Sequence, residues 1–198
     1  MLRRMTDETE HTTLKIKLTE SSVGQFKARS SGLDVPRDEY ASAALHFALQ
    51  DDGCIDESKM VVSREQDVYL SLRIPVWLRE SVAKLGHRSG CNVASFSGMA
   101  LGQYFERHER DPRELIALFY IDAALSDSEE GRLSEAALDT VLERCGRRLL
   151  SGVAPAFMAN WFFNRFKSRI REIETGRSVE AFSIAWLKDR FTRLAETK

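Results

Sequence analysis

The chain contains an internal repeat, which constrains its fold more than any single motif does. The segments Leu14–Leu45 and Leu70–Leu101 have the same length and the same order of patterns. Each begins with five residues in which apolar and polar side chains alternate, LKIKL and LSLRI, and each ends at an Ala-Leu pair. Alternation with a period of two predicts a strand with one buried face. The repeat therefore predicts two copies of one structural element.

Each repeat is predicted to be a strand followed by two helices. Gly90 is a typical residue after a helix end, and Asn92 is a typical N-cap. The predicted strands cover residues 13–18 and 68–74. The predicted helices cover residues 20–31, 37–50, 76–89 and about 92–108.

Composition divides the chain into five expected segments. The stretch between the repeats has six acidic and two basic residues and no helical period, which is typical of a linker. The remaining third has only helical patterns, with predicted starts at Asp111-Pro112, Ser134, Pro155 and Ser178. The Pro155 helix is predicted to run to about Glu174. The segments are a flexible tail (1–12), repeat unit 1 (13–50), the acidic linker (51–67), repeat unit 2 (68–109) and a helical C-terminal domain (110–198).

Charge and cysteine content point to a soluble intracellular protein without naming its partner. The formal net charge is −1, but a local group of bases is invisible in such a sum. The three cysteines, Cys54, Cys91 and Cys145, are far apart and odd in number, which favours free thiols in a reducing compartment. No apolar run approaches bilayer-spanning length, and the start lacks the apolar core of a secretory signal. We expect a cytoplasmic protein without a membrane partner.

The sequence contains no recognisable catalytic or cofactor motif. The histidines His11, His46, His87 and His108 share no metal-ligand spacing with one another or with the cysteines. There is no phosphate-binding loop of the Gly-x4-Gly-Lys type and no nucleophile elbow. His46 lies inside a predicted helix beside Phe47, which favours a structural role. We expect a protein that is not an enzyme and that needs no cofactor or metal.

Each repeat has the order strand, helix, tight turn, helix, and its strand alternates apolar and polar residues. This arrangement resembles the ribbon-helix-helix superfamily of bacterial and phage DNA-binding proteins. The resemblance covers residues 13–50 and 68–107. In that family two strands pair antiparallel and enter the DNA major groove, and four helices close the core behind them. The side chains thereby expected to face the core are Leu14, Ile16, Leu18, Leu70, Leu72 and Ile74. The side chains thereby expected to contact bases are Thr13, Lys15, Lys17, Tyr69, Ser71 and Arg73.

The outward set would also suit the solvated face of an ordinary amphipathic strand. The identical spacing of the two repeats, and the lack of further strands to build a larger sheet, favour the ribbon. An isolated two-stranded ribbon needs helices behind it to be stable, and the sequence supplies them.

The resemblance also implies a phosphate contact at the start of the second helix of each repeat. Asn92, Val93 and Ala94 are uncharged, and a helix N-terminus attracts anions through its dipole and free N–H groups. The first repeat departs from this pattern, because Pro36 lacks an N–H group and only Arg37 favours a phosphate there. Three acids lie around that helix start: Asp34, Asp38 and Glu39.

Aromatic residues alternate with bases near the middle of the C-terminal third. We expect the aromatics to fill the core of a small bundle and the bases to form its solvated rim. The alternative is a basic aromatic surface for nucleic acid or a partner protein. The aromatics concerned are Trp161, Phe162, Phe163 and Phe166.

The expected fold class is mainly α, with tandem ribbon-helix-helix units that share a two-stranded antiparallel ribbon and an all-helical C-terminal domain. Both units lie in one chain, which predicts an intramolecular pseudo-dimer, although exchange of strands between chains stays open. The expected function is sequence-specific binding of double-stranded DNA in transcriptional regulation, on a plasmid or elsewhere. The alternatives are an accessory protein of conjugative transfer, partnered by a relaxase, and an antitoxin-like protein. The C-terminal domain is expected to mediate homo-oligomerisation or contact a protein such as RNA polymerase.

Overall fold

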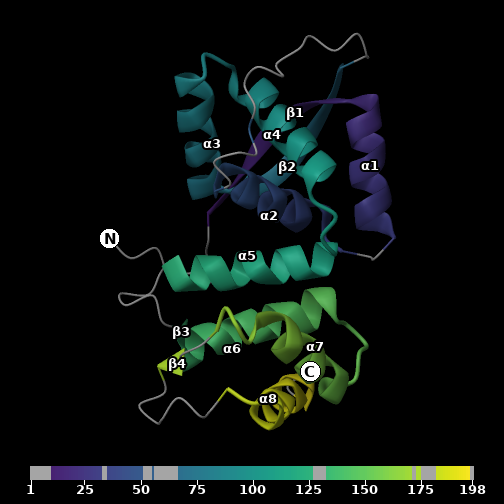
Figure 1. Ribbon diagram of the computed structural model, residues 1–198, viewed down its shortest axis with the longest axis vertical. Coiled ribbons are helices and arrows are strands. Elements are labelled where there is room, and N and C mark those ends of the chain that lie inside the picture. Colours follow the sequence, from purple (N-terminus) through teal and green to yellow (C-terminus); the bar gives the residue numbers. More distant parts are fainter. Residues whose placement is uncertain are drawn as a thin grey trace. The chain divides into compact units, whose positions relative to one another are not determined.

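The computed structural model in Figure 1 describes residues 10–32, 35–50, 55, 67–126, 133–170, 173–174 and 182–196. Most of the expected tail and linker, residues 1–9 and 51–66 apart from residue 55, lies outside this described part. The chain forms two compact units, and the boundary between them falls between residues 116 and 117. One unit contains both repeats, and the other contains the C-terminal third.

The two predicted strands form, and they pair antiparallel within the chain. Strand β1 (His11–Thr19) lies beside β2 (Asp67–Pro75) in a two-stranded sheet. Both strands are longer than the alternation predicted. His11 and Thr12 belong to β1 and not to the tail, and Asp67 belongs to β2 and not to the linker.

Two helices follow each strand, close to the predicted positions. They are α1 (Glu20–Ser31), α2 (Arg37–Gln50), α3 (Val76–Arg88) and α4 (Val93–Arg107). The Thr19 hydroxyl caps α1 by accepting from the Ser22 backbone N–H at 3.2 Å. Gly90 has a φ of 67°, a left-handed conformation that lets the chain turn between α3 and α4.

The core lies between the helices and one face of the ribbon. Figure 1 shows α2 and α4 across the ribbon with α1 and α3 at its flanks, and contacts of α4 with β1 and of α2 with β2 agree with this view. Of the six residues expected inside, Leu70 is half-buried. The other five are buried: Leu14, Ile16, Leu18, Leu72 and Ile74.

An aromatic cluster joins the two repeats behind the ribbon. The Phe26 and Tyr40 rings stack with centroids 5.5 Å apart, and Phe105 of α4 lies 5.4 Å from Tyr40. Arg29 lies over the Phe105 ring and donates to the backbone oxygens of Phe105 and His108. Burial raises the pKa of Tyr40, while Arg29 acts to lower it. The cluster fixes α1 and α2 of the first repeat against α4 of the second.

The C-terminal unit is mainly helical but not all-helical, which corrects the expectation. Two short segments, β3 (Leu133–Ser134) and β4 (Ile173–Glu174), pair in parallel. The unit boundary falls inside α5 (Pro112–Ser126). The helical elements after it are α6 (Glu135–Arg144), the π-helix η2 (Cys145–Leu149), α7 (Pro155–Phe166) and α8 (Ile184–Glu196).

The helix predicted from Pro155 to about Glu174 is too long. It ends at Phe166, whose carbonyl oxygen accepts from both Arg169 and Ile170 in a turn, and Glu174 lies in β4. The last helix begins at Ile184, and Ser178 lies outside the described residues.

The expected aromatic core is confirmed for three of its four members. Trp161, Phe162 and Phe166 are buried. Phe163 is half-buried and stacks on Phe182 at 5.6 Å. Arg165 lies over the Trp161 ring, so the base covers the edge of the aromatic core, as a solvated rim does.

Candidate nucleic-acid interface

The ribbon carries polar side chains on the face opposite its core. We call this the outward ribbon face, and define it as the outward-pointing side chains of β1 and β2. The six residues that the sequence placed there do lie together on it. Lys17 is half-exposed, and Tyr69 is 64% exposed although it is aromatic. The remaining four are exposed: Thr13, Lys15, Ser71 and Arg73.

The strand register relates the two repeats by a pseudo-two-fold axis. Lys15 pairs with Ser71, and each is the second residue of its repeat. Thr13 is equivalent to Tyr69 in the repeat, and Lys17 is equivalent to Arg73. The pairing on either side of the centre is reciprocal, because Thr13 pairs with Arg73 and Lys17 pairs with Tyr69. Reciprocal pairing of equivalent positions is the property of a two-fold interface between identical subunits. Here a single chain supplies both sides.

The ribbon face also holds residues that the sequence analysis did not assign to it. Asp67 begins β2 opposite Thr19, and His11 begins β1 opposite Pro75. Both are exposed and continue the alternation of outward positions. That alternation was the available signal for them, but His11 was assigned to the tail and Asp67 to the acidic linker.

Asp67 forms an ion pair with Lys17 on this face. The Lys17 Nζ atom lies 2.7 Å from Asp67 Oδ2, and the two side chains are 34% and 47% exposed. Hydrogen bonding to Asp67 raises the pKa of Lys17, although desolvation acts against it. The two residues are diagonal neighbours across the ladder, where opposite charges attract. Lys17 therefore stays charged but has an acidic partner.

The start of α4 has the features expected of an anion-binding helix end. Asn92 is the N-cap, and its Oδ1 atom accepts from the Ser95 backbone N–H at 2.9 Å. Val93 and Ala94 are half-exposed. N–H groups in the first turn have no acceptor inside their own helix, so those of Val93 and Ala94 point out of the helix end. No acidic side chain lies in the first turn of α4.

The start of α2 differs in charge from the start of α4. Asp38 and Glu39 lie in its first turn, and Arg37 Nε is 3.8 Å from Asp38 Oδ1. Arg37, the base in this first turn, therefore has an acid beside it, as the sequence suggested. The two helix starts therefore differ in charge, which favours an anion at α4 over α2.

A glycine fixes α4 against the ribbon. A Cβ atom added at Gly98 would overlap the backbone carbonyl of Lys17. The α4 backbone thus lies directly on β1 at Lys17, whose side chain points to the outward ribbon face. At about 1.5 Å rise per residue, the α4 N-terminus is about 8 Å along the helix axis from this contact.

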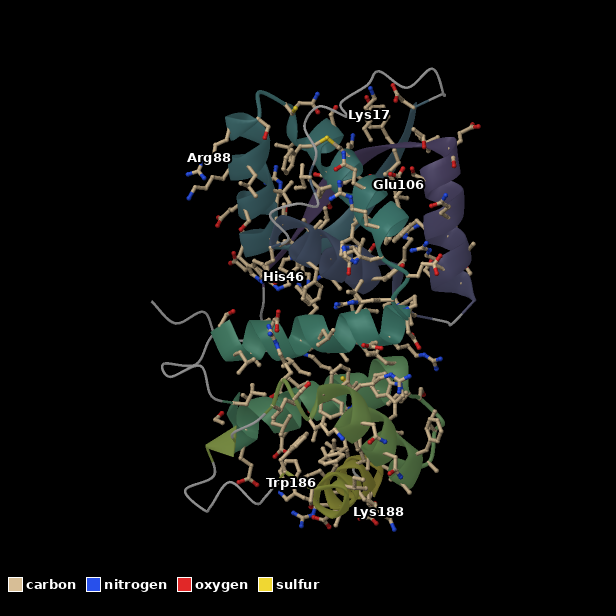
Figure 2. The ribbon with its side chains drawn as sticks, viewed as in Figure 1. Lys17, His46, Arg88, Glu106, Trp186 and Lys188 are labelled. Atoms are coloured by element: carbon tan, nitrogen blue, oxygen red, sulfur yellow. The ribbon has the colours of Figure 1, made fainter. Side chains whose placement is uncertain are left out.

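His46 has a packed environment, in agreement with the structural role expected for it. It is buried, its ring lies 5.6 Å from that of Trp77, and its Nε2 atom is 3.0 Å from Gln50 Nε2. Figure 2 shows it at the lower edge of α2, away from Lys17 at the top of the unit. Within the described ranges, no group of three or more His, Cys, Asp or Glu side chains could hold a metal ion. Among the same residues no helix is long and apolar enough to cross a membrane.

Comparison of the chain with protein-family models, curated proteins and solved structures gives no significant match.

Proposed function

We propose that this protein is a sequence-specific, double-stranded DNA-binding protein whose ribbon enters the major groove. In this proposal residues 13–50 and 68–107 are tandem ribbon-helix-helix units, and the outward ribbon face contacts base edges. The first turn of α4 binds a backbone phosphate beside the groove. Its proposed use in the cell is transcriptional regulation.

The observation that carries the proposal is the register of the outward ribbon face. Lys15 and Ser71 lie opposite each other at the centre, with Lys17 and Arg73 at equivalent places on either side. The local symmetry of B-form DNA is also two-fold, and proteins that read duplexes as dimers match it. A two-fold polar ribbon with three bases is therefore suited to a duplex surface.

The dimensions and chemistry of the ribbon support the same conclusion. Paired strands lie about 4.8 Å apart, and the major groove is about 12 Å wide, so it admits a two-stranded ribbon. Lys and Arg donate to guanine O6 and N7, and a serine or threonine hydroxyl both donates and accepts. The face thus offers side chains that discriminate bases, in addition to positive charge.

Alanine substitution on the ribbon tests the proposal. A binding site is first selected from random duplexes, and affinity is then measured by fluorescence anisotropy for that site and for an unrelated duplex. Lys15→Ala and Arg73→Ala should each weaken binding to the selected site about tenfold and should relax base preference at one position. Binding to the unrelated duplex should change much less.

The matched controls remove the same charges from α3. Lys84 and Arg88 are exposed there, and Figure 2 shows Arg88 pointing away from the ribbon. Lys84→Ala and Arg88→Ala should leave the base preference unchanged. Equal losses on selected and unrelated duplexes for the ribbon variants would refute base recognition. A wild-type protein that selects no duplex would refute the proposed function as a whole.

The cellular use is tested separately, by mapping the DNA bound by the protein in its source cell. Occupancy at promoters, with altered transcript levels on deletion, supports regulation. Occupancy confined to an origin of conjugative transfer would replace transcriptional regulation by an accessory role in transfer.

A further inference from the structure

Asp67 is an acid on a face that is proposed to meet a polyanion. Its carboxylate is about half-exposed and lies 2.7 Å from Lys17 Nζ on the outward ribbon face. It belongs to β2, so the strand ladder holds its backbone in place. An acid in such a position repels phosphates, and the pair lowers the net positive charge that the ribbon offers to DNA. On the duplex, a further partner for this carboxylate would have to be a hydrogen-bond donor.

The major groove offers few such partners. An ionised carboxylate only accepts hydrogen bonds. Phosphate oxygens, guanine O6 and N7, and thymine O4 are acceptors too, so they cannot bind it. The donors in the groove are the amino groups of cytosine N4 and adenine N6. Asp67 is therefore suited to an amino group of a base and to nothing else on the duplex.

Lys17 narrows the choice between these two amino groups. An ammonium needs acceptors, and a G·C pair presents two of them, O6 and N7 of guanine, beside the cytosine amino donor. An A·T pair interposes its amino donor between the N7 acceptor of adenine and the O4 acceptor of thymine. An ammonium can donate to both guanine acceptors, and a carboxylate is the typical acceptor for cytosine N4, so a lysine beside an aspartate matches the G·C pattern better than the A·T pattern.

We infer that Lys17 and Asp67 recognise one G·C base pair as a unit, with Lys17 donating to guanine and Asp67 accepting from the cytosine N4 amino group. This inference rests on the proposed function. It assigns Asp67 a role in specificity and predicts a G·C pair under the end of the ribbon where β1 finishes and β2 begins.

The test uses base analogues in the selected duplex. At each G·C pair in turn, cytosine is replaced by its analogue without the 4-amino group, and affinity is measured for wild type, Asp67→Ala and Lys17→Ala. The wild type should lose affinity about tenfold at one pair near the end of the site. Asp67→Ala should show no loss at that pair, because the contact is already absent. Replacing the guanine of the same pair by 7-deazaguanine should affect wild type more than Lys17→Ala.

Three controls keep the inference separable from a purely structural role of the ion pair. Asp67→Asn retains an acceptor oxygen and should keep part of the discrimination, which a lost charge alone would not produce. Circular dichroism and thermal unfolding report whether any variant has lost the fold. Asp67→Ala should bind unrelated duplexes as well as wild type or better, because it removes a negative charge.

Several outcomes would overturn the inference. One is an Asp67→Ala variant that binds all duplexes more tightly with unchanged base preference, since Asp67 would then only modulate charge. Another is that removal of the cytosine 4-amino group changes the affinity of the wild type and of Asp67→Ala equally at every position. A third is a site selection in which the wild type prefers an A·T pair at the position where the Asp67→Ala variant has lost its base preference. Failure of the proposed function is a separate outcome, because the wild type would then select no site in the first step.

Discussion

At the scale of single residues, Gly98 shows how closely the two repeats are packed. The residue at the matching place in the first repeat is Ser42, whose side chain donates to the Asp38 carbonyl oxygen in its own helix. In α4 no side chain is tolerated, because the Lys17 carbonyl occupies the space where Cβ would lie. This contact places β1 of one repeat directly under a helix of the other.

Gly98→Ala should therefore destabilise the fold, because α4 must move away from β1. Overpacking of this kind costs about 3 kcal/mol at the upper end of its usual range. The measurement is urea unfolding followed by circular dichroism. The control is Gly102→Ala in the same helix, where a Cβ would have Ser22 Oγ as its nearest neighbour at 3.8 Å. That substitution should stabilise the protein by up to about 1 kcal/mol through helix propensity. Two glycine variants with equal stability would contradict the proposed packing.

The sequence could not have predicted the role of Gly98. A glycine inside a helical pattern indicates only a loss of helix propensity, and the neighbour that excludes a side chain belongs to a strand far away in the chain. The outward positions Lys15, Ser71 and Arg73 were predictable because alternation is local. Asp67 was missed because its acidic neighbours suggested a linker, although it also continues the alternation of β2.

At the scale of elements, helix boundaries were predicted correctly where a capping residue marks them in the sequence. The start of α4 follows its N-cap Asn92, and the turn before it contains Gly90 in a left-handed conformation. The helix from Pro155 was predicted too long because no glycine or proline follows Phe166 before Gly176. A turn stabilised by the Phe166 carbonyl ends it instead, and Ile170 is buried beyond it. Tertiary packing, which is not local, decided that end.

The Asn92 cap gives a prediction for α4 as an element. Asn92→Ala removes the hydrogen bond to the Ser95 N–H and should lower stability by about 1 kcal/mol. It should also weaken DNA binding on selected and unrelated duplexes alike, because the first-turn N–H groups lose their fixed direction toward a phosphate. Chemical denaturation and anisotropy measure the two effects.

Ser134→Ala is the matched control for this variant. Ser134 caps α6 in the C-terminal unit by accepting from the Ala137 N–H at 3.1 Å. The Ser134→Ala variant should lose about as much stability as Asn92→Ala, because it loses the same type of hydrogen bond, and it should keep its affinity for DNA. Equal affinity losses in the two variants would show that reduced stability, and not the phosphate contact, explains the effect.

At the scale of the whole molecule, two repeats in one chain make a symmetric frame with unequal surfaces. The pairing of β1 with β2 is intramolecular, so it does not depend on protein concentration. The backbone register is two-fold, but the side chains on it differ, and the start of α2 carries acids where the start of α4 does not. A homodimer presents the same side chains twice and therefore recognises a palindrome. This chain presents two different sets of side chains.

The last prediction separates the contribution of the two-fold backbone from that of the outward side chains. The wild-type protein should select a DNA element without two-fold symmetry, because its strands present Thr-Lys-Lys and Tyr-Ser-Arg at equivalent positions. The variant D67H/Y69T/S71K/R73K gives residues 67–73 of β2 the outward side chains of residues 11–17 of β1 and leaves the buried face unchanged. Since the register already relates the strands by a two-fold axis, this variant should select a palindrome built from the half-site that β1 contacts. Selection from random duplexes followed by sequencing measures both results. A palindromic wild-type site, or a symmetrised variant that still selects an asymmetric one, would mean that base preference originates outside the ribbon.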